Sequence, residues 1–153
     1  MANTPAVSTS FKVDLLKGLH AFGASVARAD TTKDSFKAAL YLATATIDAS
    51  TTAYTASGEV SGTGYTAGGV DVTNATEPTA GATTTAYWTP SASFSWTTFT
   101  SSGAFDTTLI YNDTAVGKNA VASYGFGSQT VTAGNFSLTM PTNDDSFGLL
   151  RIA

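Results

Sequence analysis

The sequence predicts an all-β protein: an antiparallel β-sandwich or barrel-like domain with a short N-terminal helix. Threonine, which is enriched on the pleated surface of strands, accounts for 28 of the 153 residues. Eight or nine short segments of strand-like pattern recur at intervals of about 8–14 residues, with turn residues between them, a spacing typical of sandwiches and barrels. Only one segment has a helical period, so alternating βαβ units are excluded.

The helical segment lies near the N-terminus, where apolar residues recur on one face of a 3.6-residue period. These residues are Phe11, Leu15, Leu16, Leu19 and Phe22. Ser10 is the expected N-cap and Gly23 the expected end. We therefore divide the chain into an N-terminal arm and helix, residues 1–24, and a β domain, residues 25–153.

The expected strands follow in order, beginning with the alternating segment 36–42. The next begins at Val70 and ends near Asn74 or Pro78. The later ones are 84–89, 94–97, 108–111, 121–126, 135–140 and 147–152. Residues 44–57 have no clear period and predict a long connection. The region 58–69 is rich in glycine and predicts tight turns. Further turns are expected at Asn112-Asp113, Gly127-Ser128, Gly134-Asn135 and Asn143-Asp144-Asp145.

Charge and composition exclude several classes of function. The chain has no cysteine, so it has neither disulfides nor thiolate metal ligands. Its net charge is −4 and its seven basic residues are scattered, which argues against nucleic-acid binding. No apolar run approaches the length of a membrane span, and the first residues lack the pattern of a secretory signal. We expect no membrane association and no export by this sequence.

The residues that could carry catalysis form no recognisable motif. His20 is the only histidine, and the nucleophile signature G-x-S-x-G is absent. Glu59 and Glu77 are the only glutamates, Asp144-Asp145 lacks the pattern of a calcium loop, and 62–67 lacks the last glycine of a dinucleotide-binding motif. We therefore expect no enzyme activity, no cofactor and no metal.

The longest uncharged stretch is 78–105, which contains both tryptophans. Its aromatic residues are Tyr87, Trp88, Phe94, Trp96 and Phe99. Alternating aromatic residues on a strand are typical of a core, but an exposed aromatic face would suit a sugar or a protein partner. Both interpretations stay open on the sequence alone.

Several stretches together resemble small virion structural proteins of tailed bacteriophages. They are FKVDLLKGLHAF at 11–22, DSFKAALYL at 34–42, EVSGTGYTAGG at 59–69, LIYN at 109–112 and the C-terminal 132–153 with TAGNFSLTMP and LLRIA. The glycine-rich motif at 59–69 is the most specific. The family commonly has A-R-G-A before L-I-Y-N, whereas this chain has AFDTT at 104–108.

The resemblance implies a non-enzymatic capsid cement or decoration protein on the exterior of the virion, assembled in the host cytoplasm. Its partners would be the major capsid protein and sister copies, as a homodimer or trimer. The residues that we expect at the interface are Phe11, Leu15, Leu19, Phe22, Glu59, Tyr65, Trp88 and Trp96.

Two other functions stay open. A tail, baseplate or fibre-adaptor component would share this composition but would occur in fewer copies per particle. A carbohydrate-binding β module would use the aromatic segment around Trp88 and Trp96.

Overall fold

The computed structural model describes residues 3–8, 11, 15, 18–23, 33–81 and 84–153. The described chain is all-β, and every strand pair in it is antiparallel. Its strands are β1 (Ala6–Val7), β2 (Phe36–Leu42), β3 (Val70–Val72), β4 (Thr79–Ala80), β5 (Ala86–Trp88), β6 (Phe94–Phe99), β7 (Phe105–Asn112), β8 (Ala120–Gln129), β9 (Gly134–Leu138) and β10 (Leu150–Ile152).

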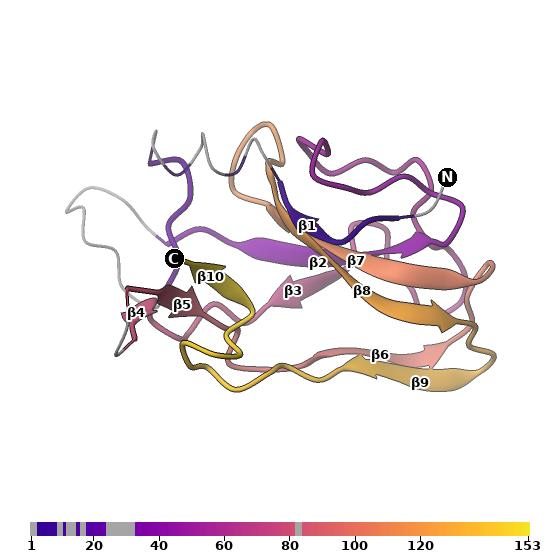
Figure 1. Cartoon of the computed structure of the whole chain (residues 1–153). Helices are drawn as coiled ribbons and strands as arrows, with labels where there is room; N and C mark the ends of the chain where they lie inside the picture. The colour runs from indigo at the N-terminus through magenta and orange to yellow at the C-terminus, as the bar shows by residue number, and fades with distance from the viewer. Residues whose placement is uncertain (1–2, 9–10, 12–14, 16–17, 24–32, 82–83) are drawn as a thin grey trace.

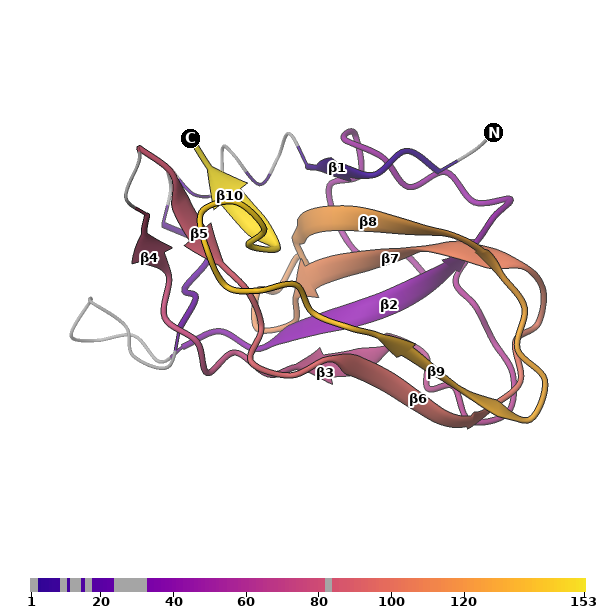
Figure 2. The ribbon, with the colours of Figure 1, turned by 60° about the horizontal axis from the view of Figure 1, so that its bottom comes forward.

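The strands form three sheets (Figure 1). The largest has the order β1-β8-β7-β2-β3, and a pair of strands, β6 and β9, faces it. The third sheet, β10-β5-β4, lies at one end of the molecule. Figure 2 shows that β3 runs next to β6, so the two layers approach each other along that side.

The main core lies between the five-stranded sheet and β6–β9. The alternation within β2 places Phe36, Ala38 and Leu40 on this face, where all three are buried. Phe94, Trp96 and Phe99 of β6 pack against them from the facing layer. Phe105 of β7, Trp88 of β5 and Leu150 of β10 complete the core.

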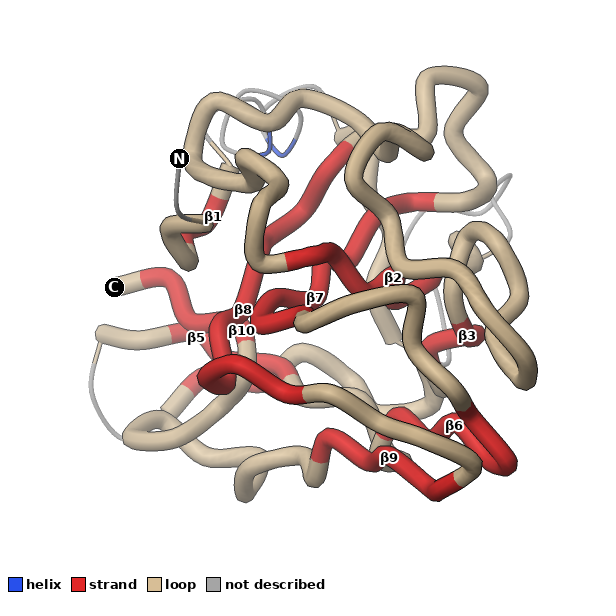
Figure 3. The backbone as a smooth tube through the Cα atoms, turned by 90° about the vertical axis from the view of Figure 1, so that its right-hand side faces the viewer, coloured by secondary structure: helices blue, strands red, loops and turns tan. Residues whose placement is uncertain are grey.

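The other face of the same sheet is also covered. Ala39 and Tyr41 of β2 point to this side and pack with Ile47, Leu109 and Tyr111 in a second cluster. The connection after β2 lies over this face, on the side of the sheet opposite β6 and β9 (Figure 3). The long connection expected at 44–57 is therefore a covering layer, and this explains why β2 and β7 are buried on both faces.

The expected helix over 11–22 is not seen. Phe11 and Leu15 have helical conformation, but Gly18 adopts a φ of 67° and its N–H bonds to the carbonyl of Leu15, so the chain turns there. The expected N-cap Ser10 and Leu16 lie outside the described residues. A glycine with positive φ is incompatible with a helix that continues through it, so the described residues 18–23 do not extend a helix to the predicted end at Gly23.

A second correction concerns Gly127-Ser128, which the sequence predicts as a turn. Both residues lie inside β8, where the pairing with β7 shifts register between Phe105 and Thr107. The positive φ of Gly127, 79°, therefore serves a β-bulge and not a chain reversal. The predicted turn at Gly134-Asn135 is also wrong, because both residues lie in β9.

Candidate interaction surfaces

An aromatic cluster fixes the N-terminal segment to the end of the main core. The Phe22 ring stacks on Phe36 with centroids 4.5 Å apart, and it lies 4.7 Å from the Trp88 ring. Phe11 is fully buried, with its ring 4.9 Å from that of His20. Three of the expected interface residues, Phe11, Phe22 and Trp88, are therefore brought together, but they pack inward.

A polar network holds the same segment from its other side. The Asp34 carboxylate accepts the Ala21 N–H at 2.7 Å and the Asn112 side-chain amide at 2.9 Å. The same Asn112 nitrogen lies 3.2 Å from His20 Nδ1. The Asn74 amide oxygen accepts the Gly23 N–H at 2.8 Å. His20 thus belongs to a structural network.

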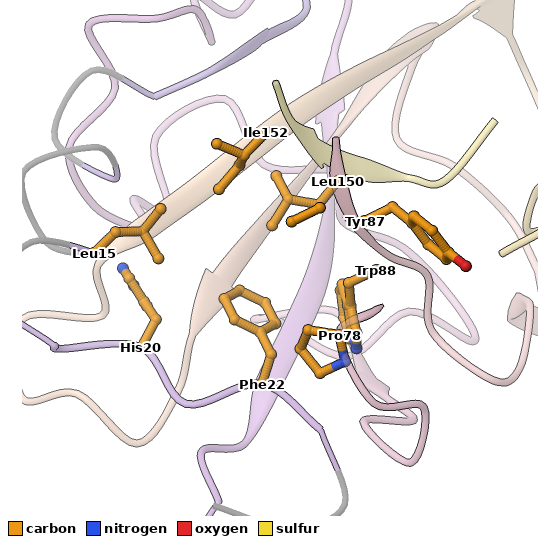
Figure 4. A pocket seen from close by; sticks show the side chains of 9 residues that line it. Leu15, His20, Phe22, Pro78, Tyr87, Trp88, Leu150 and Ile152 are labelled. Atoms are coloured by element: carbon orange, nitrogen blue, oxygen red, sulfur yellow. The ribbon is translucent and has the colours of Figure 1, made fainter. Parts of the chain in front are cut away.

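An apolar pocket of about 250 Å³ opens beside this cluster (Figure 4). Its lining side chains are Leu15, His20, Phe22, Pro78, Ala86, Tyr87, Trp88, Leu150 and Ile152. Leu15, another expected interface residue, forms part of the wall, and Leu19 is 38% exposed. Eight of its nine lining side chains are apolar or aromatic, and the ninth is the imidazole of His20.

The glycine-rich region 58–69 is organised by one carboxylate. Glu59 accepts hydrogen bonds from the Tyr54 hydroxyl at 2.7 Å, the Tyr65 hydroxyl at 2.8 Å and the Gly68 N–H at 2.7 Å. The Tyr65 hydroxyl accepts the Leu40 N–H at 2.9 Å, which ties the loop to β2. The expected interface residues Glu59 and Tyr65 are therefore engaged within the molecule.

The tyrosines around this carboxylate are held neutral. Desolvation raises the pKa of Tyr54 to about 12, helped by its hydrogen bond to Glu59 and by the charge of that carboxylate. Burial likewise raises the pKa values of Tyr41, Tyr65 and Tyr111 above their ordinary value. All four hydroxyls can therefore act as hydrogen-bond donors at neutral pH.

The uncharged segment 78–105 divides between core and surface. In β6, Phe94 and Trp96 are buried at 2% and 3% exposure, whereas Ser95 and Thr97 are exposed. In the partner strand β9, Asn135 and Ser137 are exposed as well. The Ser95 and Ser137 hydroxyls are paired at 3.1 Å. We call the exposed residues Ser95, Thr97, Asn135 and Ser137 the neutral face.

Two exposed apolar side chains were not singled out from the sequence. Val116 is fully exposed between β7 and β8, and Phe147 is 66% exposed before β10. Asp144 fixes the backbone at Phe147, because its carboxylate accepts the N–H groups of Ser146 and Phe147. Phe147 therefore stands on a defined turn, and only its exposure in the fold could have revealed it.

Within the described residues, no group of three histidine or acidic side chains is placed to hold a metal ion. In the same part of the chain, no helix has the length and apolar composition needed to cross a membrane. No protein-family model, curated protein or solved structure matches the chain.

Proposed function

We propose that this chain is a virion structural protein of a tailed bacteriophage, a capsid cement or decoration protein that stabilises the shell by protein–protein contacts. The proposed partners are the major capsid protein and sister copies, at the exterior of the capsid. In this proposal the chain catalyses no reaction and works through its surface.

The neutral face is the observation that carries the proposal. It consists of hydroxyl and amide side chains on a two-stranded sheet, and no charged residue occurs in 78–105. Neutral contacts are insensitive to salt screening, which suits a protein that must stay on its shell in any ionic environment. An interface of standard size buries about 1,200–2,000 Å² in total, and repetition over a shell makes modest contacts collectively strong.

The two packed layers that carry the neutral face also suit a protein that stabilises a shell. The β6–β9 layer packs its aromatic side chains against the five-stranded sheet, and we propose that these two layers form a β-sandwich. The family resemblance is most specific at 59–69, whose Glu59 network fastens the loop to β2. Those motif residues would then keep the body rigid, while the neutral face makes the contact.

A shell-binding assay tests the proposal. Shells assembled without the chain are mixed with the wild type and with Ser137→Arg, and bound protein is measured after sedimentation. We expect the added charge to weaken binding by at least about tenfold, because an unpaired buried charge is costly at an interface. Thr44→Arg, on an exposed position of the opposite loop layer, is the matched control. Equal binding by both variants would refute the role of the neutral face.

The alternatives make different predictions. A tail, baseplate or fibre-adaptor component would be found at six to a few dozen copies in purified virions, whereas a decoration protein would be found at hundreds. A carbohydrate module that uses Trp88 and Trp96 would need those rings at the surface, but both are buried. We therefore favour the shell over sugar binding.

A further inference from the structure

We propose that residues 18–23, here called the strap, cover one end of the main core in a manner that depends on pH. The strap stays docked while the His20 side chain is neutral, and it is released when that side chain takes up a proton. The inference concerns the isolated chain and does not depend on shell binding.

Asn112 fixes the state of the His20 ring, because every hydrogen-bonding position of its buried amide is occupied. The amide oxygen accepts the N–H groups of Thr114 and Ala115, both at 3.0 Å. The amide nitrogen donates to Asp34 at 2.9 Å and lies 3.2 Å from His20 Nδ1. A rotated amide would set its oxygen against the Asp34 carboxylate and its N–H groups against two backbone donors, so the surroundings allow only this orientation.

His20 Nδ1 must therefore accept a hydrogen bond. A neutral imidazole with its proton on Nε2 supplies that acceptor, whereas an imidazolium has a donor at both nitrogens. A proton on Nδ1 would place two donors 3.2 Å apart. His20 is only 8% exposed and its ring neighbours are Phe11, Phe22 and Phe36, so a charge on the ring would lose most of its hydration.

The charged side chains near the strap do not remove this conflict. Asp34 attracts a cation, but its contact with His20 runs through the Asn112 amide, and it already accepts the Ala21 N–H. The group that a proton on Nδ1 meets directly is therefore the Asn112 N–H. Further charged side chains on the adjoining elements are Lys33 in the same cleft as Asp34, Glu77 against Gly23, and the ion pairs Lys37–Asp71 and Lys118–Asp113.

Docking of the strap and protonation of His20 therefore compete. The strap is held by the Gly23 N–H, which donates to Asn74 at 2.8 Å, and by the Phe22 ring, which stacks on Phe36. A free imidazole takes up its proton at about pH 6.5, so docking is complete above that pH and weakens as the pH falls below it. Each further pH unit then lowers the ratio of docked to released strap by up to about tenfold.

The composition of the chain supplies unambiguous reporters for a test by NMR. His20 is the only histidine, so a single imidazole signal reports both its tautomer and its charge. The two tryptophans, labelled as 5-fluorotryptophan, separate the strap from the rest of the fold. Trp88 lies 4.7 Å from Phe22 of the strap (Figure 4), whereas Trp96 packs beside Phe136 between β6 and β9. Both kinds of signal are followed from about pH 7.5 to about pH 4.5.

We expect the Nε2–H tautomer at neutral pH. As the pH falls, the His20 signal and the Trp88 fluorine signal should change together, while the Trp96 signal stays in place. His20→Gln keeps an oxygen that can accept the Asn112 hydrogen bond, and His20→Phe keeps an aromatic ring. Since neither side chain takes up a proton, the Trp88 signal of both variants should stay constant over the same range.

The opposing results are equally definite. An Nδ1–H tautomer at neutral pH would mean that Asn112 does not set the state of the ring. Protonation of His20 without a change at Trp88 would mean that the charged ring fits the docked strap, and no change in either signal would mean that acid does not release it. Movement of both tryptophan signals would indicate global unfolding, and a Trp88 transition in the two variants would assign the effect to a carboxyl group. Each of these results contradicts the proposal and leaves shell binding to be judged by its own assay.

Discussion

The Tyr65 hydroxyl donates a 2.8 Å hydrogen bond to the Glu59 carboxylate and accepts a 2.9 Å hydrogen bond from the Leu40 N–H. One hydroxyl thus joins the glycine-rich loop to the central strand β2. Through Glu59 and Tyr65, side-chain hydrogen bonds therefore connect the backbone of the glycine-rich loop to the backbone of β2.

Removing the carboxylate should destabilise the fold. Glu59→Ala leaves two tyrosine hydroxyls and the Gly68 N–H without their acceptor. We expect the free energy of unfolding to fall by about 2–3 kcal/mol, as is typical for hydrogen bonds to charged groups. Urea denaturation measures it. Asp71→Asn, which removes one negative charge from an exposed side chain, is the control and should change stability by less than about 0.5 kcal/mol.

Alkaline pH should loosen the same region. The pKa of Tyr54 is raised from 10.0 to about 12 in the folded chain, so the folded state retains this proton more strongly than the unfolded state. The associated stability is complete below pH 10 and is lost as the pH rises towards about 12. The urea midpoint should therefore stay level up to about pH 9 and then decrease. Tyr54→Phe should decrease less steeply above pH 10, and a slope equal to that of the wild type would contradict the assignment.

The strand pattern was readable in the sequence because alternation along β2 and β6 reflects which side chains are buried. The two-residue strands β1 and β4 were missed, since so short a segment carries no period. The predicted helix continued through Gly18 because its apolar spacing continues to Phe22. In the fold, packing on Phe36 and Trp88 satisfies Phe22 without a helix.

Which aromatic side chains are buried was harder to predict, since a residue type does not reveal which way its side chain points. Trp96 and the exposed Ser95 are adjacent in β6, yet one lies in the core and the other on the neutral face. Asp34, a partner of Asn112, lies 78 residues away along the chain. The partners of Glu59 lie on irregular segments. Neither network therefore produces a periodic pattern in the sequence. The sequence therefore indicated the motif at 59–69 as important without indicating its internal role.

Two glycines separate the effect of backbone conformation from that of close packing. Gly69 and Gly127 have nearly equal φ angles, 81° and 79°. A Cβ at Gly69 would collide with the carbonyl group of Ala38, whereas a Cβ at Gly127 would meet nothing within 4 Å. We expect Gly127→Ala to cost about 1–2 kcal/mol, the cost of a left-handed alanine. Gly69→Ala should cost at least about 3 kcal/mol, because backbone atoms must move. If thermal denaturation shows an equal loss of stability for the two variants, Gly69 is not packed closely against the backbone of β2.

The hydrogen-bond network of His20, Asn112 and Asp34 predicts a pH-dependent loss of stability for a substitution of Asn112. Asn112 is fully buried, and its side-chain nitrogen donates to the Asp34 carboxylate at 2.9 Å. Asn112→Asp replaces that donor with a second acceptor, so two carboxylates would face each other in a buried site. Repulsion between the two carboxylates favours uptake of a shared proton as the pH falls, and that proton restores a hydrogen bond. The loss of stability relative to the wild type should therefore be large at pH 7 and smaller at pH 4. Melting temperatures at both pH values measure this difference. Asn143→Asp adds the same charge on an exposed loop and should show no such dependence; a defect of Asn112→Asp that is equal at both pH values would mean that Asp34 is not its close partner.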